Sequence, residues 1–365
     1  MTAQRTPHLV QLVPAALGGI RDYAENIQRV WAQSGIPCRI LPLAQRDVAE
    51  APLWSRLAAA APRADAVEPI VQTVLIVHYS GYGYEPRGLC GWLNRELEDA
   101  RARLGPRLRI VVMFHELYAS GPPWRSAFWL GGRQAKIAAG LAGLSDVALT
   151  NTQAHARWLE QQLEPRRPVD VWPVFSNVGE PGAVVPFGAR PRRLVVFGSE
   201  PTRRRALQQV HRHARQLGDL GITELVEVGA GHAVDTRPGR LQARFAGRLD
   251  EAALSELLAQ SAFGLIEYPA HCIGKSTVFA AYAAHGCVAL NACPSPQGAD
   301  GLTPGQHFLG LDPRLREMPR DEDLHRVAVD AKAWYDQHKL SIQTTALAQT
   351  CGMGPSNASS SPRQD

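Results

Sequence analysis

Residues 273–277, of sequence IGKST, combine a glycine, a cation and two hydroxyls immediately before an expected helix over 277–285. The N-terminus of a helix presents free N–H groups and a partial positive charge, so this combination favours a bound anion such as a phosphate. Lys275 is one of only 4 Lys beside 35 Arg, which indicates a specific role for its ammonium. The segment resembles the end of a P-loop, but the earlier glycine of that motif would fall at Pro269, so the P-loop interpretation fails. An ordinary capped helix is the alternative. The predicted anion site consists of Gly274, Lys275, Ser276 and Thr277.

A second cationic cluster follows the expected strand 193–198. Thr202 can cap a helix whose first turn holds Arg203–Arg205. Arginine at a helix N-terminus opposes the helix dipole unless an anion is bound there, so the cluster predicts phosphate binding, and a solvated basic face is the alternative. The residues singled out here are Ser199, Arg203 and Arg204.

Three clusters in the N-terminal half also follow expected strands. Paired glycines let a backbone approach a ligand closely, tyrosines offer stacking faces and hydroxyls to a sugar or base, and a His-Glu pair can bind hydroxyls or transfer a proton. A tight turn, a structural aromatic loop and a histidine bonded to a backbone carbonyl are the respective alternatives. The His-Glu pair is not part of HExxH, which disfavours zinc. The clusters are Gly18 with Gly19, Tyr82 with Tyr84, and His115 with Glu116.

Short apolar segments alternate with helical periodicity through both halves of the chain. Near-continuous Val, Ile and Leu are typical of parallel strands covered by helices on both faces, and ligands bind such sheets at the carboxyl ends of the strands. Strands are expected at 8–13, 38–43, 71–79, 109–116 and 147–150, and again at 193–198, 225–228, 263–268 and 288–291. Helices are expected from 20 to Gly35 and at 89–104, 133–144, 153–163, 203–217, 251–260, 277–285 and 321–338.

A stretch rich in proline, residues 164–193, interrupts this alternation and indicates a domain boundary. The last residues are rich in Gly, Ser, Pro and Asn, a composition that indicates disorder. The expected organisation is an N-terminal domain over 1–175, a linker over 176–192, a C-terminal domain over 193–320, crossing helices over 321–350 and a disordered tail over 351–365.

Composition excludes several classes of protein. The 365 residues are 45% hydrophobic and 20% charged, unlike a wholly disordered, collagen-like or coiled-coil chain. No apolar run is long enough to span a membrane and no signal peptide is recognisable, so we expect a cytoplasmic protein. The 6 Cys lack CxxC spacing, which supports neither a disulfide framework nor a zinc site. The net charge of +5 favours phosphate-bearing substrates or contact with the anionic inner face of a membrane. The basic stretch Arg190–Arg215 would make that membrane contact. Nucleic acid is not expected as a partner.

The order of these motifs along the chain resembles that of a GT-B glycosyltransferase, and it is most similar to the broad class of glycosyltransferase families one and four. The resemblance covers residues 8–345 and rests on five segments: GGIRDYAENIQRVWAQSGI, FHELYASGPPW, TNTQAHARWL, VVFGS and GKSTVFAAYAAHGCVAL. It implies an α/β fold of two Rossmann-like domains facing across a cleft, with a C-terminal helix returning to the N-terminal domain. The N-terminal domain would bind the acceptor and the C-terminal domain the nucleotide-sugar.

The resemblance also implies roles for individual residues, and a reaction that needs neither metal nor cofactor. The expected catalytic residues are His115, Lys275 and Arg204. Contacts to the donor and its diphosphate are expected at Gly18, Gly19, Ser199, Arg203, Gly274, Ser276, Thr277 and Glu267. Acceptor or sugar contacts are expected at Tyr82, Tyr84 and Glu116.

One departure from family four concerns its Glu-x7-Glu pattern, whose positions are occupied here by Ile273 and Ala281. Glu267, just upstream, could replace one of the two carboxylates. The function expected is transfer of a sugar from a nucleoside-diphosphate sugar to an acceptor hydroxyl, the acceptor being lipid-linked if the membrane contact holds. The alternatives are a non-hydrolysing sugar-nucleotide epimerase, for which Glu116, Glu180 and Glu267 are the available carboxylates, and a non-catalytic GT-B-like binding protein.

Overall fold

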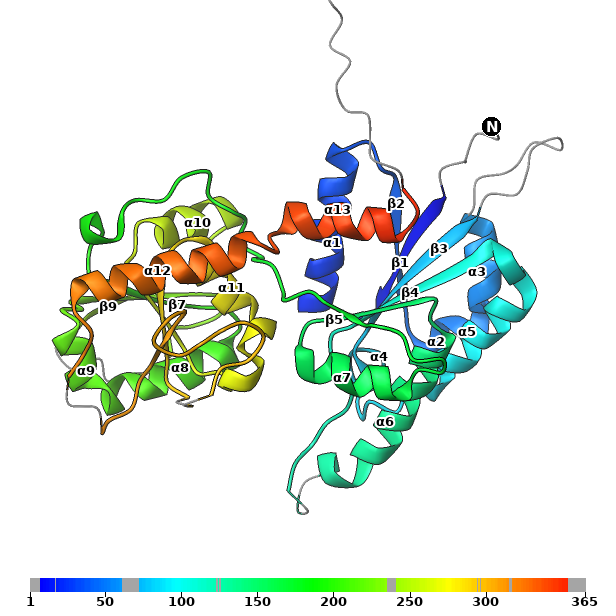
Figure 1. The fold of residues 1–365 in the computed structure, drawn as a ribbon, viewed down its shortest axis with the longest axis horizontal. Coiled ribbons are helices and arrows are strands. Elements are labelled where there is room, and N and C mark those ends of the chain that lie inside the picture. Colours follow the sequence, from blue (N-terminus) through cyan, green and yellow to red (C-terminus); the bar gives the residue numbers. More distant parts are fainter. Residues whose placement is uncertain are drawn as a thin grey trace, which may run out of the picture. The chain divides into compact units, whose positions relative to one another are not determined.

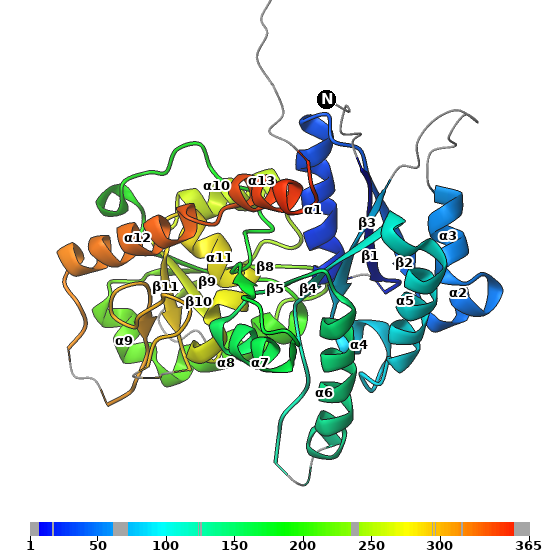
Figure 2. The same ribbon diagram turned by 45° about the vertical axis from the view of Figure 1, so that its right-hand side comes forward.

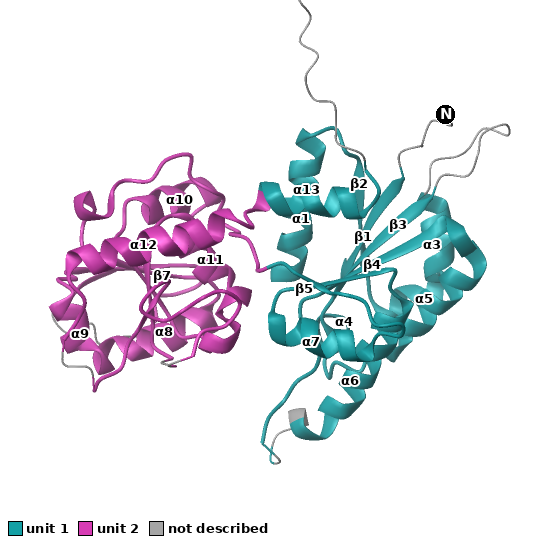
Figure 3. Ribbon diagram, in the orientation of Figure 1, with its two compact units in different colours: residues 1–172, 341–365 teal, residues 173–340 magenta. Residues whose placement is uncertain are grey.

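The computed structural model (Figure 1 and Figure 2) describes residues 7–16, 18–60, 72–122, 124, 126–234, 241–293, 295, 297–314 and 317–353. The chain divides into two compact units, shown in Figure 3. Unit 1 comprises residues 1–172 and 341–365, and unit 2 comprises residues 173–340. The expected linker, 176–192, therefore falls within unit 2, and the expected disordered tail lies outside the described residues from 354 onward.

Unit 1 contains a parallel sheet of six strands in the order β2-β1-β3-β4-β5-β6. Its strands are β1 (His8–Pro14), β2 (Cys38–Leu43), β3 (Thr73–Tyr79), β4 (Leu108–Phe114), β5 (Val147–Thr150) and β6 (Asp170–Val171). Its helices are α1 (Gly19–Gln33), α2 (Gln45–Glu50), α3 (Leu53–Ala60), α4 (Gly81–Tyr84), α5 (Gly91–Leu104), η1 (Gly105–Arg107), α6 (Ser126–Leu144), α7 (Gln153–Gln162) and α13 (Leu340–Thr350). Every residue of β3 is buried, as its largely apolar sequence predicts for a strand covered on both faces.

The two faces of this sheet are covered by different helices. On one face, residues of α3, α5, α6 and α7 share a core with alternate residues of the strands. On the other, α1 is held by α13, because Trp31 Nε1 donates to Thr344 O at 2.9 Å and the Tyr23 hydroxyl donates to Gln343 Oε1 at 2.9 Å. The last helix of the chain therefore packs on unit 1 beside the first one.

Unit 2 contains a second six-stranded parallel sheet, in the order β12-β11-β10-β7-β8-β9. Its strands are β7 (Arg193–Phe197), β8 (Glu224–Val228), β9 (Gln242–Phe245), β10 (Phe263–Ile266), β11 (Val288–Asn291) and β12 (Leu309–Gly310). Its helices are η2 (Phe187–Ala189), α8 (Glu200–Arg212), α9 (Ala214–Asp219), α10 (Glu251–Ala259), η3 (Ala270–Lys275), α11 (Thr277–Ala284) and α12 (Asp321–Asp336). The expected α/β class with two Rossmann-like sheets is confirmed.

Helices again cover both faces. α8 and α9 pack on one face of the sheet, α10 and α11 pack on the other, and α12 contributes to both cores. The helix expected over 203–217 is interrupted at His213, which ends α8 and precedes α9. No helix in the described ranges is long and apolar enough to cross a bilayer.

Candidate functional site

Each sheet has one point at which the order of its strands reverses. In unit 1 the chain proceeds outward from β1 to β2 in one direction and to β3 in the other, and in unit 2 the same reversal lies between β7 and β10. The helices that follow the two strands of such a pair leave on opposite faces of the sheet, which opens a crevice at the carboxyl ends, where ligands bind in open α/β sheets. The two pairs of strands at the switch points are β1 with β3 and β7 with β10. Every motif predicted from the sequence follows one of these four strands or β4, which is next to β3.

In unit 2, the loop after β7 lies against the start of α11. Gly198 has φ +122, a conformation that favours glycine, and a Cβ built there would lie 3.6 Å from Val278 Cγ2 in the first turn of α11. The N-cap of α8 is Ser199 rather than the predicted Thr202, and its exposed hydroxyl shares a hydrogen bond of 2.9 Å with the Thr202 hydroxyl. The first turns of α8 and α11 are therefore neighbours at the switch point.

The loop between β10 and α11 is held by a side chain from the next strand. Asn291, buried at the end of β11, accepts from Tyr268 N at 3.1 Å and donates to Tyr268 O at 2.8 Å. Ser276 caps α11 by accepting from Phe279 N at 3.2 Å. That bond satisfies one first-turn N–H, while the amides of Thr277 and Val278 belong to the group that a helix N-terminus leaves without helical partners. The structure therefore contains the capped helix of the alternative interpretation, and it begins at Thr277 as expected.

Lys275 precedes this cap and is half-buried. Among the described residues its ammonium makes no hydrogen bond or ion pair. Its charge acts on Cys272, where burial raises the pKa of the thiol and the nearby Lys275 opposes that rise. Glu267, at the carboxyl end of β10, accepts a 3.3 Å hydrogen bond from Gln209 of α8. The loop thus offers one uncommitted cation and one carboxylate.

Arg203 was predicted to be a cation that binds the diphosphate, and its surroundings in the structure contradict that role. Its side chain is fully buried and donates through Nε to Glu227 Oε1 at 2.8 Å, through Nη1 to Gly198 O at 2.9 Å and through Nη2 to Ala230 O at 3.0 Å. A Cβ at Gly229 would overlap this guanidinium. With every nitrogen bonded to the protein, Arg203 fastens the loops after β7 and β8 to each other, and we exclude it from the groups that contact a ligand.

Arg204, the next residue, points away from this core. It is about half exposed and pairs with Glu200 at 2.6 Å, one turn earlier on α8. That hydrogen bond and charge lower the pKa of the Glu200 carboxyl. An exposed pair of this kind is weak, so Arg204 can exchange Glu200 for an anionic ligand at little cost.

In unit 1, His115 follows β4 and belongs to a buried chain of hydrogen bonds. Its Nε2 lies 3.2 Å from His78 Nδ1, and His78 Nε2 lies 2.9 Å from Gln11 Oε1. Gln11 donates its own amide to Ala24 O at 3.1 Å, which fixes the direction of the amide oxygen. Burial lowers the pKa of His78 to about 3, so its ring is neutral.

These contacts determine where the protons lie. Gln11 Oε1 only accepts, so the proton of the neutral His78 ring is on Nε2 and its Nδ1 is an acceptor. His115 must then donate from its Nε2 to His78 Nδ1. Tyr23 of α1 completes the packing, edge-on to the His115 ring at 4.9 Å. Sequence reasoning singled out His115 but missed Gln11, His78 and Tyr23, which look like ordinary core residues of two strands and a helix.

The paired glycines lie beside open space. Gly18 has an extended backbone and precedes Gly19, the first residue of α1, and a Cβ at either would meet nothing within 4 Å. The tight-turn alternative for Gly18 is therefore wrong, while the backbone at this position is accessible to a ligand.

The three predicted acceptor contacts have different surroundings. Tyr84 is buried against Trp92 and its hydroxyl donates to Leu12 O at 3.3 Å, so it is a core residue rather than an acceptor contact. Tyr82 is exposed, and its hydroxyl accepts from Gln134 Nε2 at 3.1 Å. Glu116 is exposed and accepts from the Ser80 hydroxyl at 2.7 Å.

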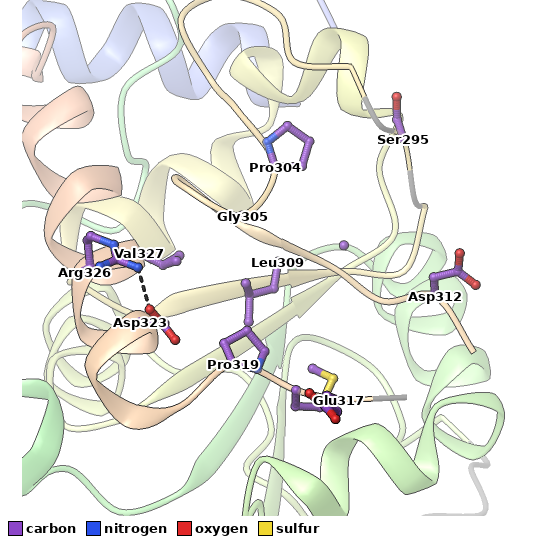
Figure 4. Close-up of a pocket in the computed structure, with 12 residues that line it drawn as sticks. Ser295, Pro304, Gly305, Leu309, Asp312, Glu317, Pro319, Asp323, Arg326 and Val327 are labelled. Carbon is purple, nitrogen blue, oxygen red and sulfur yellow. Dashed lines mark hydrogen bonds and ion pairs between the residues drawn. The ribbon is translucent and has the colours of Figure 1, made fainter. Parts of the chain in front are cut away.

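A pocket of about 860 Å³ lies elsewhere in unit 2, between β12, the loops that flank it and the first turns of α12 (Figure 4). Its charged lining consists of Asp312, Glu317, Asp323 and Arg326, and Arg326 is paired with Asp323. An excess of carboxylates repels a diphosphate. Although it is spacious, this pocket is not the candidate site. No cluster of His, Cys, Asp and Glu suited to a metal ion occurs within the described ranges.

Two parallel sheets, each with its own switch point, and a last helix that returns to the first unit define the GT-B fold. The solved structures that resemble this chain have that fold. An alpha-glucosyltransferase in complex with UDP has a TM-score of 0.57 at 10% identity, covering 95% of this chain and 100% of its own. An alpha,alpha-trehalose 6-phosphate synthase from Burkholderia multivorans has a TM-score of 0.56 at 13% identity, covering 95% and 97%. A UDP-forming trehalose-phosphate synthase from Burkholderia vietnamiensis has a TM-score of 0.56 at 13% identity, covering 99% and 100%. No protein-family model and no curated protein matches the sequence.

Proposed function

We propose that this protein is a glycosyltransferase that moves a sugar from a nucleoside-diphosphate sugar to an acceptor hydroxyl. The observation that carries the proposal is the switch point of unit 2, where the first turns of α8 and α11 adjoin and Lys275 has no partner among the described residues. Two helix N-termini and a cation are the groups that a diphosphate requires. The similarity in fold to enzymes solved with UDP supports the same conclusion.

The chemistry that this arrangement can perform is electrostatic. As the bond between sugar and diphosphate breaks, negative charge grows on the diphosphate oxygens. That charge would be stabilised without a metal ion by Lys275, by the amides of Thr277 and Val278 and by Arg204, whose pair with Glu200 is exposed. Activity that survives a chelator is therefore expected, and activity that is lost with EDTA and restored by a divalent cation would show that these groups are insufficient.

The proposed part played by unit 1 is to hold the transferred sugar. Gly18 and Gly19 would allow the ligand to approach their backbone, and His115 would face the sugar. The hydrogen bonds through His78 and Gln11 would hold the His115 ring in a fixed orientation.

Ile273 and Ala281, which occupy the two positions of the Glu-x7-Glu pattern, are completely buried apolar residues. Glu267 directly follows β10, the strand that also precedes the predicted diphosphate site. We propose that it contacts the donor, and Glu267→Gln should then raise the KM for donor more than it lowers kcat.

The experiment that tests the proposed function begins with ligand-induced thermal stabilisation by UDP-, GDP- and dTDP-sugars, since a ligand of the native state raises its stability. Donor turnover is then compared between the wild type and Lys275→Met. We expect turnover to fall by about 10²–10³-fold, the cost of removing one donor from an oxyanion site. Lys332→Met is the matched control, because Lys332 is paired with Asp336 on α12. Equal turnover in both variants would remove Lys275 from the mechanism.

Peripheral contact with a membrane, where a lipid-linked acceptor would be found, is also part of this proposal. The basic stretch Arg190–Arg215 is poorly suited to it. Most of its arginines are buried or already paired with carboxylates, namely Arg190, Arg192, Arg193, Arg203, Arg204 and Arg215. Most of the positive charge of this stretch is therefore compensated within the protein.

A further inference from the structure

The N-terminal end of α6 carries a concentration of exposed aromatic side chains. Trp124 is 84% exposed, Trp129 is 71% exposed and Phe128 is 50% exposed. Large apolar side chains are seldom left so open on a soluble surface, and three within six residues form a patch rather than scattered exceptions. In both Figure 1 and Figure 2 the beginning of α6 projects from unit 1, beyond the carboxyl ends of the strands.

The sequence of α6 explains why this end stays outside the core. Gln134, Ala138 and Leu141 lie on its buried face and anchor the helix to unit 1. Trp129, Arg133 and Lys136 are spaced by four and three residues, so they lie along one outward stripe, and all three are exposed. The helix is therefore fixed by its later turns and presents an aromatic and basic stripe to its surroundings.

The charge on this stripe is not balanced locally. No Asp or Glu occurs between residues 117 and 145. Among the described residues, Arg133 and Lys136 form neither a hydrogen bond nor an ion pair. By contrast with the stretch Arg190–Arg215, this surface retains its positive field and can attract an anionic partner.

We propose that this surface, the aromatic-basic tip formed by Trp124, Phe128, Trp129, Arg133 and Lys136, docks onto a lipid bilayer that contains anionic headgroups. Tryptophan is suited to the boundary between headgroups and acyl chains, and Arg or Lys one or two turns further along the helix reaches the phosphates. The tip projects outward, as insertion into a bilayer requires, whereas a sugar would be enclosed in a concave site. The proposal deepens the membrane part of the proposed function, and vesicle binding requires no sugar transfer, so the two can fail separately.

The test is co-sedimentation of the full-length protein with vesicles of phosphatidylcholine alone or of phosphatidylcholine with about one-third phosphatidylglycerol. We expect binding to the mixed vesicles that weakens as salt is raised, because a Debye length shrinks to about 8 Å at 0.15 M ionic strength. Arg133→Gln with Lys136→Gln should weaken binding about 25-fold, about fivefold for each cation, which corresponds to about 1 kcal/mol each. Trp124→Ser with Trp129→Ser should weaken binding to the mixed vesicles at least tenfold, at low salt and at high salt alike.

A matched control separates this surface from the general basicity of the chain. Arg205→Gln with Arg212→Gln removes the same charge from exposed positions on α8 and should leave vesicle binding unchanged. Trp124→Phe with Trp129→Phe should preserve binding while reducing the quenching of tryptophan fluorescence by brominated lipids. Loss of binding in the α8 control but not in the tip variants would overturn the proposal. So would tip variants that bind vesicles normally but lose a protein complex or transfer to a soluble acceptor.

Discussion

The interpretation of Arg203 as the residue that joins two loops, rather than as a ligand cation, leads to a quantitative prediction. Arg203→Met removes a guanidinium that bonds to Glu227, Gly198 O and Ala230 O. It leaves the Glu227 carboxylate, which is itself buried, without its counter-ion. Removing one partner of a buried ion pair typically costs about 3–5 kcal/mol. We therefore expect the free energy of unfolding of unit 2 to fall by about that amount.

The assay is urea denaturation followed by hydrogen exchange, which reports the two units separately. Arg203→Met with Glu227→Leu removes both charges, so the double variant should be more stable than Arg203→Met alone. A loss below about 1 kcal/mol in Arg203→Met, accompanied by weaker binding of a nucleotide-sugar, would refute this reasoning and restore Arg203 to the donor site. Arg204→Met is the control, since its exposed pair with Glu200 contributes little to stability.

Three further predictions follow from the described contacts. Burial lowers the pKa of His78 from 6.5 to about 3, so between these pH values the unfolded chain binds more protons than the folded one. Stability should therefore fall as the pH drops from 6.5 toward 3. His78→Gln should reduce this dependence on pH in acid titrations followed by circular dichroism. The ¹⁵N spectrum of His78 should show a neutral ring protonated on Nε2, and Gln11→Leu should make its two tautomers comparably populated. Gly229→Ala should destabilise unit 2 in urea because its Cβ would overlap Arg203, whereas Gly231→Ala, at an exposed position, should cost only its backbone strain.

The strands that carry the site were predictable because they are buried on both faces and read as continuous apolar segments. β9 was missed for the opposite reason, since Gln242, Ala243 and Arg244 are exposed at the edge of the sheet and show no apolar pattern. Crossing helices were expected over 321–350, but only the first was given bounds, because the weak amphipathic pattern of α13 follows α12 after only three residues. Edge elements depend on pairing partners that a single sequence does not reveal.

Among the candidate residues, those in loops were predicted more successfully than those whose role depends on burial. Ser276 was placed immediately before a helix that begins at Thr277, and it is the N-cap of that helix, because a helix start is a local property of the sequence. Arg203 and Arg204 are adjacent and chemically identical, yet one is completely buried and the other half exposed, and only the arrangement of β8 behind α8 distinguishes them. Tyr82 and Tyr84 differ in the same way. The contact of His115 with His78 joins two strands that are 37 residues apart, so no local pattern could indicate it.

Hydrogen exchange of the full-length protein with and without UDP-glucose tests the central claim most directly. If a diphosphate occupies the switch point of unit 2, amides in residues 198–204 and 267–278 will exchange more slowly in the complex, while those lining the acidic pocket around 304–327 will be unchanged. Slower exchange confined to the acidic pocket would place the ligand away from Lys275 and α11. An absence of binding by uridine, guanosine and thymidine diphosphate sugars alike would contradict a donor site at β7 and β10 altogether.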